Sequence, residues 1–193
     1  MPLPERERQE LFTYKDYCSW DDGRRYELYE GEVRLMAGPS RAHQGINAAL
    51  TAIFVTYLRG KPCRVYPAPF DVRLNASDED NIVVQPDLTI VCDRSKLNDA
   101  GCAGAPDMVI EIISPSSARY DRIKKFELYR RYGVGEYWIV DPDSRILEVY
   151  ILRDGYYTRT GGYSDGDTVE SATLPGLTVN MEYIFQEDTE NPS

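Results

Sequence analysis

The sequence lacks the features of an exported or membrane-embedded protein. Its first ten residues contain no apolar segment of the kind found in secretory signals, and no apolar run approaches the roughly 20 residues that a membrane span requires. We therefore expect a cytoplasmic protein with no membrane partner. The chain also has no internal repeat and no glycine-rich phosphate-binding motif, which argues against a solenoid and against a P-loop nucleotide site.

Cysteine and histidine are scarce. The four cysteines, at positions 18, 63, 92 and 102, form no C-x-x-C pair and have no histidine close by in the sequence, so a zinc site is not expected. Without an export signal we expect reduced thiols. Cys92 lies inside an apolar run and is expected to act as a small buried hydrophobe.

Positive charge is also in deficit. The chain has 22 Lys and Arg against 32 Asp and Glu, a net charge of -10. This balance argues against broad attraction to nucleic acid, because neutralisation of phosphates by Lys and Arg normally dominates that affinity. Residues 119–131 are locally basic, which is compatible either with a phosphate track or with the more ordinary solvated helix surface.

The length and the hydrophobic pattern predict one domain. A chain of 193 residues can bury one sizeable core, so we expect a single domain over 1–193, with its core at about 13–184 and short flexible ends. Before residue 75 the pattern predicts a short helix within 11–20, a hairpin over 24–36, a helix over 40–59 and an extended segment over 64–74.

The second half is predicted to alternate between strands and a helix. We expect strands over 82–91 and 108–113 with a loop over 93–105 between them, a helix over 118–132, and a strand over 136–141. The remaining residues read as antiparallel strands, including a hairpin with a DG turn at 154–155 and a closing strand segment over 174–185.

Two acidic residues interrupt strands that are otherwise apolar. Asp87 lies in IVVQPDLTIV, and Glu111 lies in MVIEII. Because side chains alternate across a strand, Glu111 shares a face with Val109 and Ile113, and Asp87 shares one with Thr89. Carboxylates in buried strands need a metal, a cation or a shifted pKa. The simpler alternative is that these acids bond to backbone N–H groups or to an arginine.

Lys125 is the basic residue that the helix over 118–132 is predicted to turn inward. At about 100° per residue, Lys125 falls between Tyr129 and Tyr132, whereas Lys124 falls nearer the polar side. The alternative for Lys125 is an ordinary surface ion pair with Asp121, four residues earlier.

Two carboxylates and a lysine suit phosphodiester hydrolysis. Carboxylate oxygens on neighbouring strands bind Mg²⁺ or Mn²⁺, which act as Lewis acids and lower the pKa of a bound water. A nearby lysine can orient the attacking water and stabilise charge on a phosphoryl group. Asp87 and Glu111 are therefore the candidate metal ligands, and Lys125 is the third candidate catalytic residue.

Several motifs in the chain resemble those of the Uma-type restriction endonuclease family, formerly a domain of unknown function. They are YELYEGEVRLM, QPDLTIV, GAPDMVIEIISPSS and DRIKKFELYRRYGVGEYWIVDP, together with a histidine that opens the helix over 40–59. The resemblance implies a fold that combines helices with a mixed sheet, between the α/β and α+β classes. Its core is of the restriction endonuclease-like PD-(D/E)XK type, with flanking helices and extra antiparallel strands. By the same resemblance, Asp87, Glu111 and Lys125 fill the motif, the partner is nucleic acid, most simply DNA, and a homodimer is expected.

The chain departs from the superfamily pattern at two points. Ile113 stands where the lysine of (D/E)XK is expected, so the lysine must come from the helix. The superfamily often adds an acid from the first core helix, and the helix over 40–59 has none. His43, Glu27 or Glu32 are the candidates to take that place; a helix-start histidine that bonds only backbone or solvent is the alternative for His43.

Three functions follow as hypotheses. The first is a metal-dependent endonuclease that uses Asp87, Glu111 and Lys125. The second is a catalytically silent module with a nuclease fold that binds nucleic acid or a protein partner; the net charge favours it, and the intact acid, acid and lysine set argues against it. The third is an assembly protein that uses its strands for oligomerisation.

Overall fold

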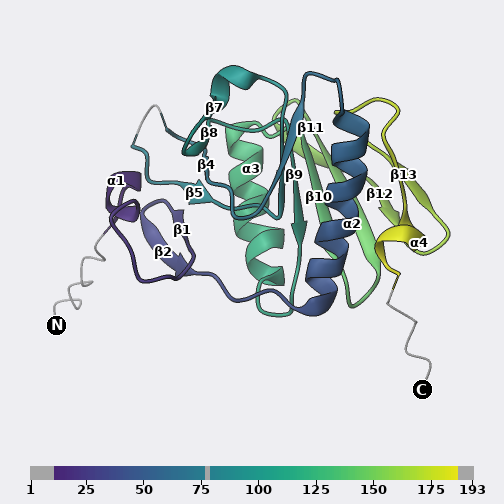
Figure 1. Ribbon diagram of the computed structural model, residues 1–193, viewed down its shortest axis with the longest axis horizontal. Helices are drawn as coiled ribbons and strands as arrows, with labels where there is room; N and C mark the ends of the chain where they lie inside the picture. The colour runs from purple at the N-terminus through teal and green to yellow at the C-terminus, as the bar shows by residue number, and fades with distance from the viewer. Residues whose placement is uncertain (1–10, 77–78, 187–193) are drawn as a thin grey trace, which may run out of the picture.

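The computed structural model describes residues 11–76 and 79–186, which form an α+β structure with two mixed sheets of six strands each and a small third sheet (Figure 1). The helical segments are α1 (Tyr14–Tyr17), α2 (Arg41–Leu58), the 3-10 helix η1 (Arg94–Lys96), the π-helix η2 (Tyr120–Lys125), α3 (Phe126–Tyr132) and α4 (Met181–Ile184). The strands are β1 (Tyr26–Tyr29), β2 (Glu32–Leu35), β3 (Arg64–Pro67), β4 (Val72–Arg73), β5 (Val83–Val84), β6 (Leu88–Val91), β7 (Leu97–Asn98), β8 (Gly101–Ala103), β9 (Met108–Ile112), β10 (Glu136–Asp141), β11 (Ile146–Arg153), β12 (Tyr156–Tyr163), β13 (Thr168–Glu170) and β14 (Thr178–Asn180).

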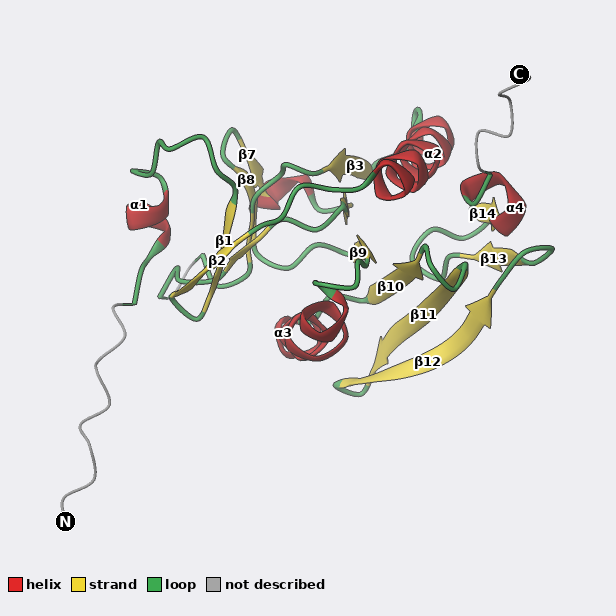
Figure 2. Ribbon diagram, turned by 90° about the horizontal axis from the view of Figure 1, so that it is seen from below, coloured by secondary structure: helices red, strands yellow, loops and turns green. Residues whose placement is uncertain are grey.

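The central sheet has the strand order β12-β11-β10-β9-β6-β3 and lies between two helices. Its parallel pair, β9 and β10, is joined by the helix over 118–132, as a parallel pair requires a crossover. Figure 2 shows α2 and α3 on opposite sides of this sheet. Phe54 of α2 packs with Ile110 and Trp138 on one face, and Leu128 of α3 packs with Val109 on the other.

The second sheet has the order β2-β1-β5-β4-β8-β7 and consists of short strands. Its β7 and β8, with η1 before them, occupy the segment 93–105 that was expected to be a loop, so that expectation was wrong. Gly101 explains the pairing of β8 with β4. A Cβ at this position would lie 2.2 Å from the Asp71 carbonyl oxygen, and the φ of 130° also favours glycine.

The run over 82–91 was predicted as one strand, and the structure divides it between the two sheets. β5 pairs with β1 and β4 in the second sheet, whereas β6 pairs with β3 and β9 in the central sheet. Pro86 has no N–H to continue a ladder, so the chain leaves one sheet there and enters the other. Asp87 therefore lies at the junction of the two sheets and not inside a strand.

Most other predicted elements are confirmed. Ser40 caps α2 by accepting a hydrogen bond from the His43 N–H, and the β1–β2 hairpin turns at Glu30 and Gly31, both with positive φ. The last segment differs from its prediction, because α4 follows β14 directly. Within the described ranges no helix is both long and apolar enough to cross a membrane.

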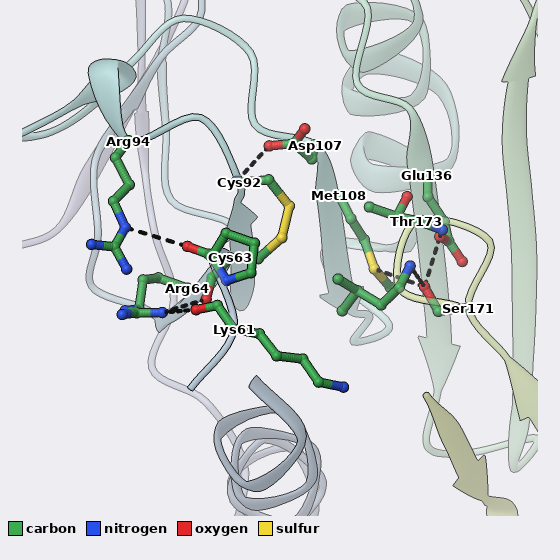
Figure 3. The surroundings of a disulfide bond; sticks show 12 residues. Lys61, Cys63, Arg64, Cys92, Arg94, Asp107, Met108, Glu136, Ser171 and Thr173 are labelled. Carbon is green, nitrogen blue, oxygen red and sulfur yellow. Dashed lines mark hydrogen bonds between the residues drawn. A yellow bond between two sulfur atoms is a disulfide. The ribbon is translucent and has the colours of Figure 1, made fainter. Parts of the chain in front are cut away.

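Cys63 and Cys92 form a disulfide, so the expectation of reduced thiols was wrong for these two residues, and Cys92 is not the free buried thiol that was expected (Figure 3). Cys18 and Cys102 are free. β3 and β6 pair antiparallel with Arg64 opposite Val91, so the next position in register brings the two cysteines face to face. Cysteine spacing along the sequence could not reveal this pair, because it depends on which strands become neighbours.

Reduction of the Cys63–Cys92 disulfide is expected to lower the free energy of unfolding by about 2–4 kcal/mol, because the bond closes a loop between cysteines 29 residues apart. Urea unfolding with and without a reductant measures this difference. The double variant Cys63→Ser, Cys92→Ser should unfold like the reduced wild type and should not respond to the reductant. Identical unfolding of the wild type in both conditions would contradict the prediction.

Candidate active site

A pocket of about 330 Å³ opens where the two sheets meet. Its lining comes from the β1–β2 hairpin, the start of α2, Asp87, the end of β9 and several residues of the segment 114–125. Four carboxylates and one lysine are among the lining residues: Glu27, Asp87, Glu111, Asp121 and Lys125. The acids come from four separate segments of the chain, which are β1, the junction before β6, β9 and the π-helix, so only the tertiary fold brings them together.

Lys125 lies at the centre of this group. Its Nζ is 2.8 Å from both Glu27 Oε1 and Glu111 Oε1 and 3.9 Å from Asp121 Oδ1, and its side chain is only 3% exposed. Glu111 Oε1 also accepts a hydrogen bond of 2.6 Å from the Tyr129 hydroxyl. The charge of Lys125 therefore links an acid of the second sheet to an acid of the central sheet.

The electrostatics of the pocket are dominated by burial and by the excess of acids. Burial raises the pKa of Glu111 well above its usual range, and the charges of Asp121, Asp87 and Glu27 raise it further, against the opposing effect of Lys125. Burial likewise raises the pKa of Asp121. Burial alone would lower the pKa of Lys125, but the surrounding carboxylates raise it well above its usual value, so the ammonium remains charged.

Asp87 is held against the strand that carries Glu111. Its Oδ2 accepts a hydrogen bond of 2.7 Å from the Ile112 N–H, and its Oδ1 lies 3.1 Å from His43 Nε2. The backbone carbonyl of Asp87 accepts a 3.0 Å hydrogen bond from the Ala68 N–H. Asp87 thus does bond to a backbone N–H, as the simpler interpretation of this acid required, and it also lines the pocket.

A π-helical segment positions the lysine. The helix over 118–132 begins and ends as an α-helix but is a π-helix over Tyr120–Lys125, a form that is frequent at functional sites. In an α-helix, a step of four residues overshoots a full turn by about 40°. In the wider π-turn the same step falls short of a full turn. The two deviations offset each other, so Asp121 and Tyr129 project in nearly the same direction, and Lys125 is turned about 40° from both on the same side of the helix.

The donor set fits a hard divalent cation. Asp87 and Glu111 both line the pocket, their oxygens are the ligand type that Mg²⁺ and Mn²⁺ prefer, and four carboxylates outnumber the one lysine. In the part of the chain that the structure describes, no group of three or more His, Cys, Asp or Glu side chains could hold a metal ion. Mg²⁺ needs only one or two carboxylates, since water and substrate phosphate complete its shell.

The structure places two of the three accessory candidates in the pocket and one outside it. Glu27 lies in the pocket and contacts Lys125, and His43 contacts Asp87, whereas Glu32 is exposed on β2 and does not line the pocket. His43 Nδ1 is buried without a hydrogen-bond partner in the described ranges. The surface ion pair was the alternative for Lys125, but its contact with Asp121 is longer than those with Glu27 and Glu111.

Sequence reasoning missed two members of the site. Asp121 was considered only as a surface partner of Lys125, and Tyr129 only as a neighbour of Lys125 on the inward side of the helix. Both occur at four-residue spacing from Lys125 on the predicted inward side of the helix, and that spacing is the signal that could have identified them.

Comparison with known proteins gives a consistent result. The chain matches the family model Uma2, described as "Putative restriction endonuclease", over residues 13–182. An uncharacterized protein of Synechocystis sp. is 26% identical over 175 residues, which covers 89% of this chain and 90% of the relative. A second uncharacterized Synechocystis protein is 24% identical over 127 residues, covering 64% and 70%.

A solved structure supports the same fold. The crystal structure of a putative nuclease from Anabaena variabilis aligns with a TM-score of 0.72 and 17% sequence identity, and the match covers 90% of this chain and 97% of that one. This similarity confirms the predicted restriction endonuclease-like fold with mixed sheets.

Proposed function

Because the chain belongs to the Uma2 family, whose description is "Putative restriction endonuclease", we propose that it is a metal-dependent endonuclease that hydrolyses phosphodiester bonds in DNA. The observation that supports this most is the convergence of Asp87, Glu111 and Lys125 from three separate elements on one pocket. Neither a surface ion pair nor an assembly interface requires a buried excess of carboxylates around a single lysine.

In this proposal Asp87 and Glu111 hold Mg²⁺ or Mn²⁺, which when bound supplies a Lewis acid and a water of lowered pKa. The Ile112 N–H fixes the Asp87 carboxylate at 2.7 Å, and the Tyr129 hydroxyl fixes Glu111 at 2.6 Å. Both ligands are therefore oriented before any substrate enters, which limits the reorganisation needed during the reaction.

Lys125 supplies positive charge and a proton donor to the reacting phosphate. Its two contacts of 2.8 Å use at most two of its three ammonium protons, and Asp121, at 3.9 Å, is beyond hydrogen-bond distance. The remaining proton can orient the attacking water or bond to a phosphoryl oxygen. His43 is a positioning residue in this scheme, because it contacts Asp87 and takes the place of an acid in α2.

Glu111→Gln is expected to reduce cleavage of supercoiled and single-stranded DNA by about a hundredfold with either Mg²⁺ or Mn²⁺, since it replaces one of the two carboxylate metal ligands with a neutral amide. Rates are measured on wild type and variant purified identically. Glu32→Gln is the matched control, because Glu32 is exposed and outside the pocket, and it should cut like wild type. Equal cutting by wild type and Glu111→Gln would remove the assigned role.

The second candidate is a nuclease-fold module that binds nucleic acid without cutting it, and the net charge of -10 favours this function. It predicts no cleavage by the wild type with either metal, together with oligonucleotide binding that weakens steeply with salt. The same assay, followed by a binding titration, separates the two candidates.

A further inference from the structure

We propose that Arg25 and Arg34 form a phosphate-binding subsite in the wall of the pocket, which takes a backbone phosphate of the nucleic-acid strand beside the acidic cluster. The inference deepens the proposed function, on which it rests for the choice of ligand. Both arginines line the same pocket as Asp87 and Glu111.

The β1–β2 hairpin aims the two arginines at the pocket. Arg34 is directly opposite Glu27 in the antiparallel register, so their side chains lie on the same face of the hairpin. Arg25 precedes Glu27 by two residues and therefore shares that face as well. Because Glu27 reaches Lys125 in the floor of the pocket, this face of the hairpin is the one that meets the site.

Arg25 is fixed in place without losing its charge. Its Nε and Nη2 both donate to Gln85 Oε1, at 2.9 and 2.8 Å, and this acceptor is a neutral amide. Gln85 is itself held, because its Nε2 donates to the Tyr17 hydroxyl at 3.0 Å and to Asp71 Oδ1 at 2.8 Å. A guanidinium has five N–H donors, so three remain for a ligand.

Arg34 is held by stacking. Its Cζ lies 3.5 Å from the centroid of the Tyr120 ring, at the start of the π-helical segment. Stacking restrains the plane of the guanidinium and leaves its edge, with the N–H donors, available to a planar or tetrahedral anion. In the described ranges neither Arg25 nor Arg34 has a carboxylate within ion-pair distance, and Glu27 is bonded to Lys125 and the Gln85 N–H.

The resulting pocket has two electrostatic parts. The acids of the floor attract a cation and repel an anion, whereas the hairpin wall carries two fixed guanidinium groups that form no ion pair within the described ranges. A phosphodiester shares one negative charge between its two non-bridging oxygens, so one oxygen can approach the cation site while the other meets the arginines. A strand that binds a pocket in a chain of net charge -10 needs such a local positive contact.

The test is a binding titration that does not depend on cleavage. A short fluorescent single-stranded DNA is titrated with protein in Ca²⁺ buffer over a series of salt concentrations. Arg25→Gln and Arg34→Gln should each weaken binding about five- to tenfold and make the plot of log affinity against log salt shallower by about 0.7. Arg24→Gln is the matched control, because Arg24 is 65% exposed, pairs with Asp22 and does not line the pocket.

Two further variants keep the test decisive. Arg25→Lys and Arg34→Lys retain the charge and should restore most of the salt slope; restoration separates a phosphate contact from a purely structural effect. Equal slopes for wild type and both glutamine variants, or no binding by wild type at low salt, would overturn the subsite. If wild type cuts DNA, Glu111→Gln does not, and the arginine variants keep the wild-type salt slope, the phosphate subsite is overturned and the endonuclease proposal stands. If the arginine variants bind DNA more weakly but wild type does not cut it, the endonuclease proposal is overturned and the subsite stands.

Discussion

Lys125→Met is expected to lower the free energy of unfolding at neutral pH by about 3–5 kcal/mol, because it leaves the buried carboxylates of Glu27, Glu111 and Asp121 without their shared cation. Methionine matches the length of the lysine stem, so little of the loss would come from packing. Urea unfolding monitored by tryptophan fluorescence measures the difference. Adding Glu27→Gln to the variant should recover part of the lost stability, since it removes one of the unpaired acids.

Lys124→Met is the matched control for this substitution. Lys124 is adjacent in the sequence but exposed, and its change should alter the free energy of unfolding by no more than about 0.5 kcal/mol. Similar losses for Lys124→Met and Lys125→Met would show that the ion-pair network does not determine the stability of this helix.

Glu136→Ala is expected to destabilise the protein by about 4–5 kcal/mol while leaving the candidate site intact. Glu136 is 0% exposed, and both of its oxygens accept two hydrogen bonds. Oε1 accepts from Trp138 Nε1 at 2.7 Å and from the Ala172 N–H at 3.3 Å. Oε2 accepts from the Ser171 hydroxyl at 2.9 Å and from the Thr173 N–H at 2.7 Å; Figure 3 shows Glu136 beside these two residues. The substitution leaves these donors buried without an acceptor.

Glu136 lies on the opposite face of the central sheet from the candidate site, so its substitution should change stability without changing the site. It shares its face of β10 with Trp138, whose ring packs against α2, whereas Glu111 lies on the α3 face with Val109. Cleavage per folded molecule and the salt slope of DNA binding should therefore match wild type. Glu170→Ala, an exposed acid in β13, serves as the control, with a change of about 0.5 kcal/mol or less. A wild-type unfolding curve for Glu136→Ala would contradict the prediction.

Local signals in the sequence were sufficient for much of the fold. Ser40 and Gly60 mark the two ends of α2, and the Glu30–Gly31 turn marks the first hairpin. Helical spacing favoured Lys125 over Lys124 as the inward-facing lysine, and Lys125 is the buried one. Each of these depends on residues within a few positions of one another, where capping, turn chemistry and periodicity act directly.

The features that escaped prediction depend on distant partners. The division of the run 82–91 follows from β5 and β6 finding neighbours in different sheets, and the disulfide follows from the pairing of Arg64 with Val91. The contact between Glu27 and Lys125 joins a strand of the second sheet to the helix that covers the central sheet, and it likewise depends on the folded chain. A single sequence does not encode strand partners in any local pattern, so these contacts become visible only when the chain is folded.

The π-helical segment links the spacing of the site residues to the length of the chain. A π-turn holds one residue more than an α-helix in the same rise, so deletion of one residue within Tyr120–Lys125 would allow a regular α-helix to form. The residues before and after the deletion would then keep nearly the same orientation relative to one another, because the deleted residue is the extra one that the wider turn holds. A homologue shortened between the aspartate and the lysine would therefore present both on the same side of an ordinary α-helix, three residues apart instead of four.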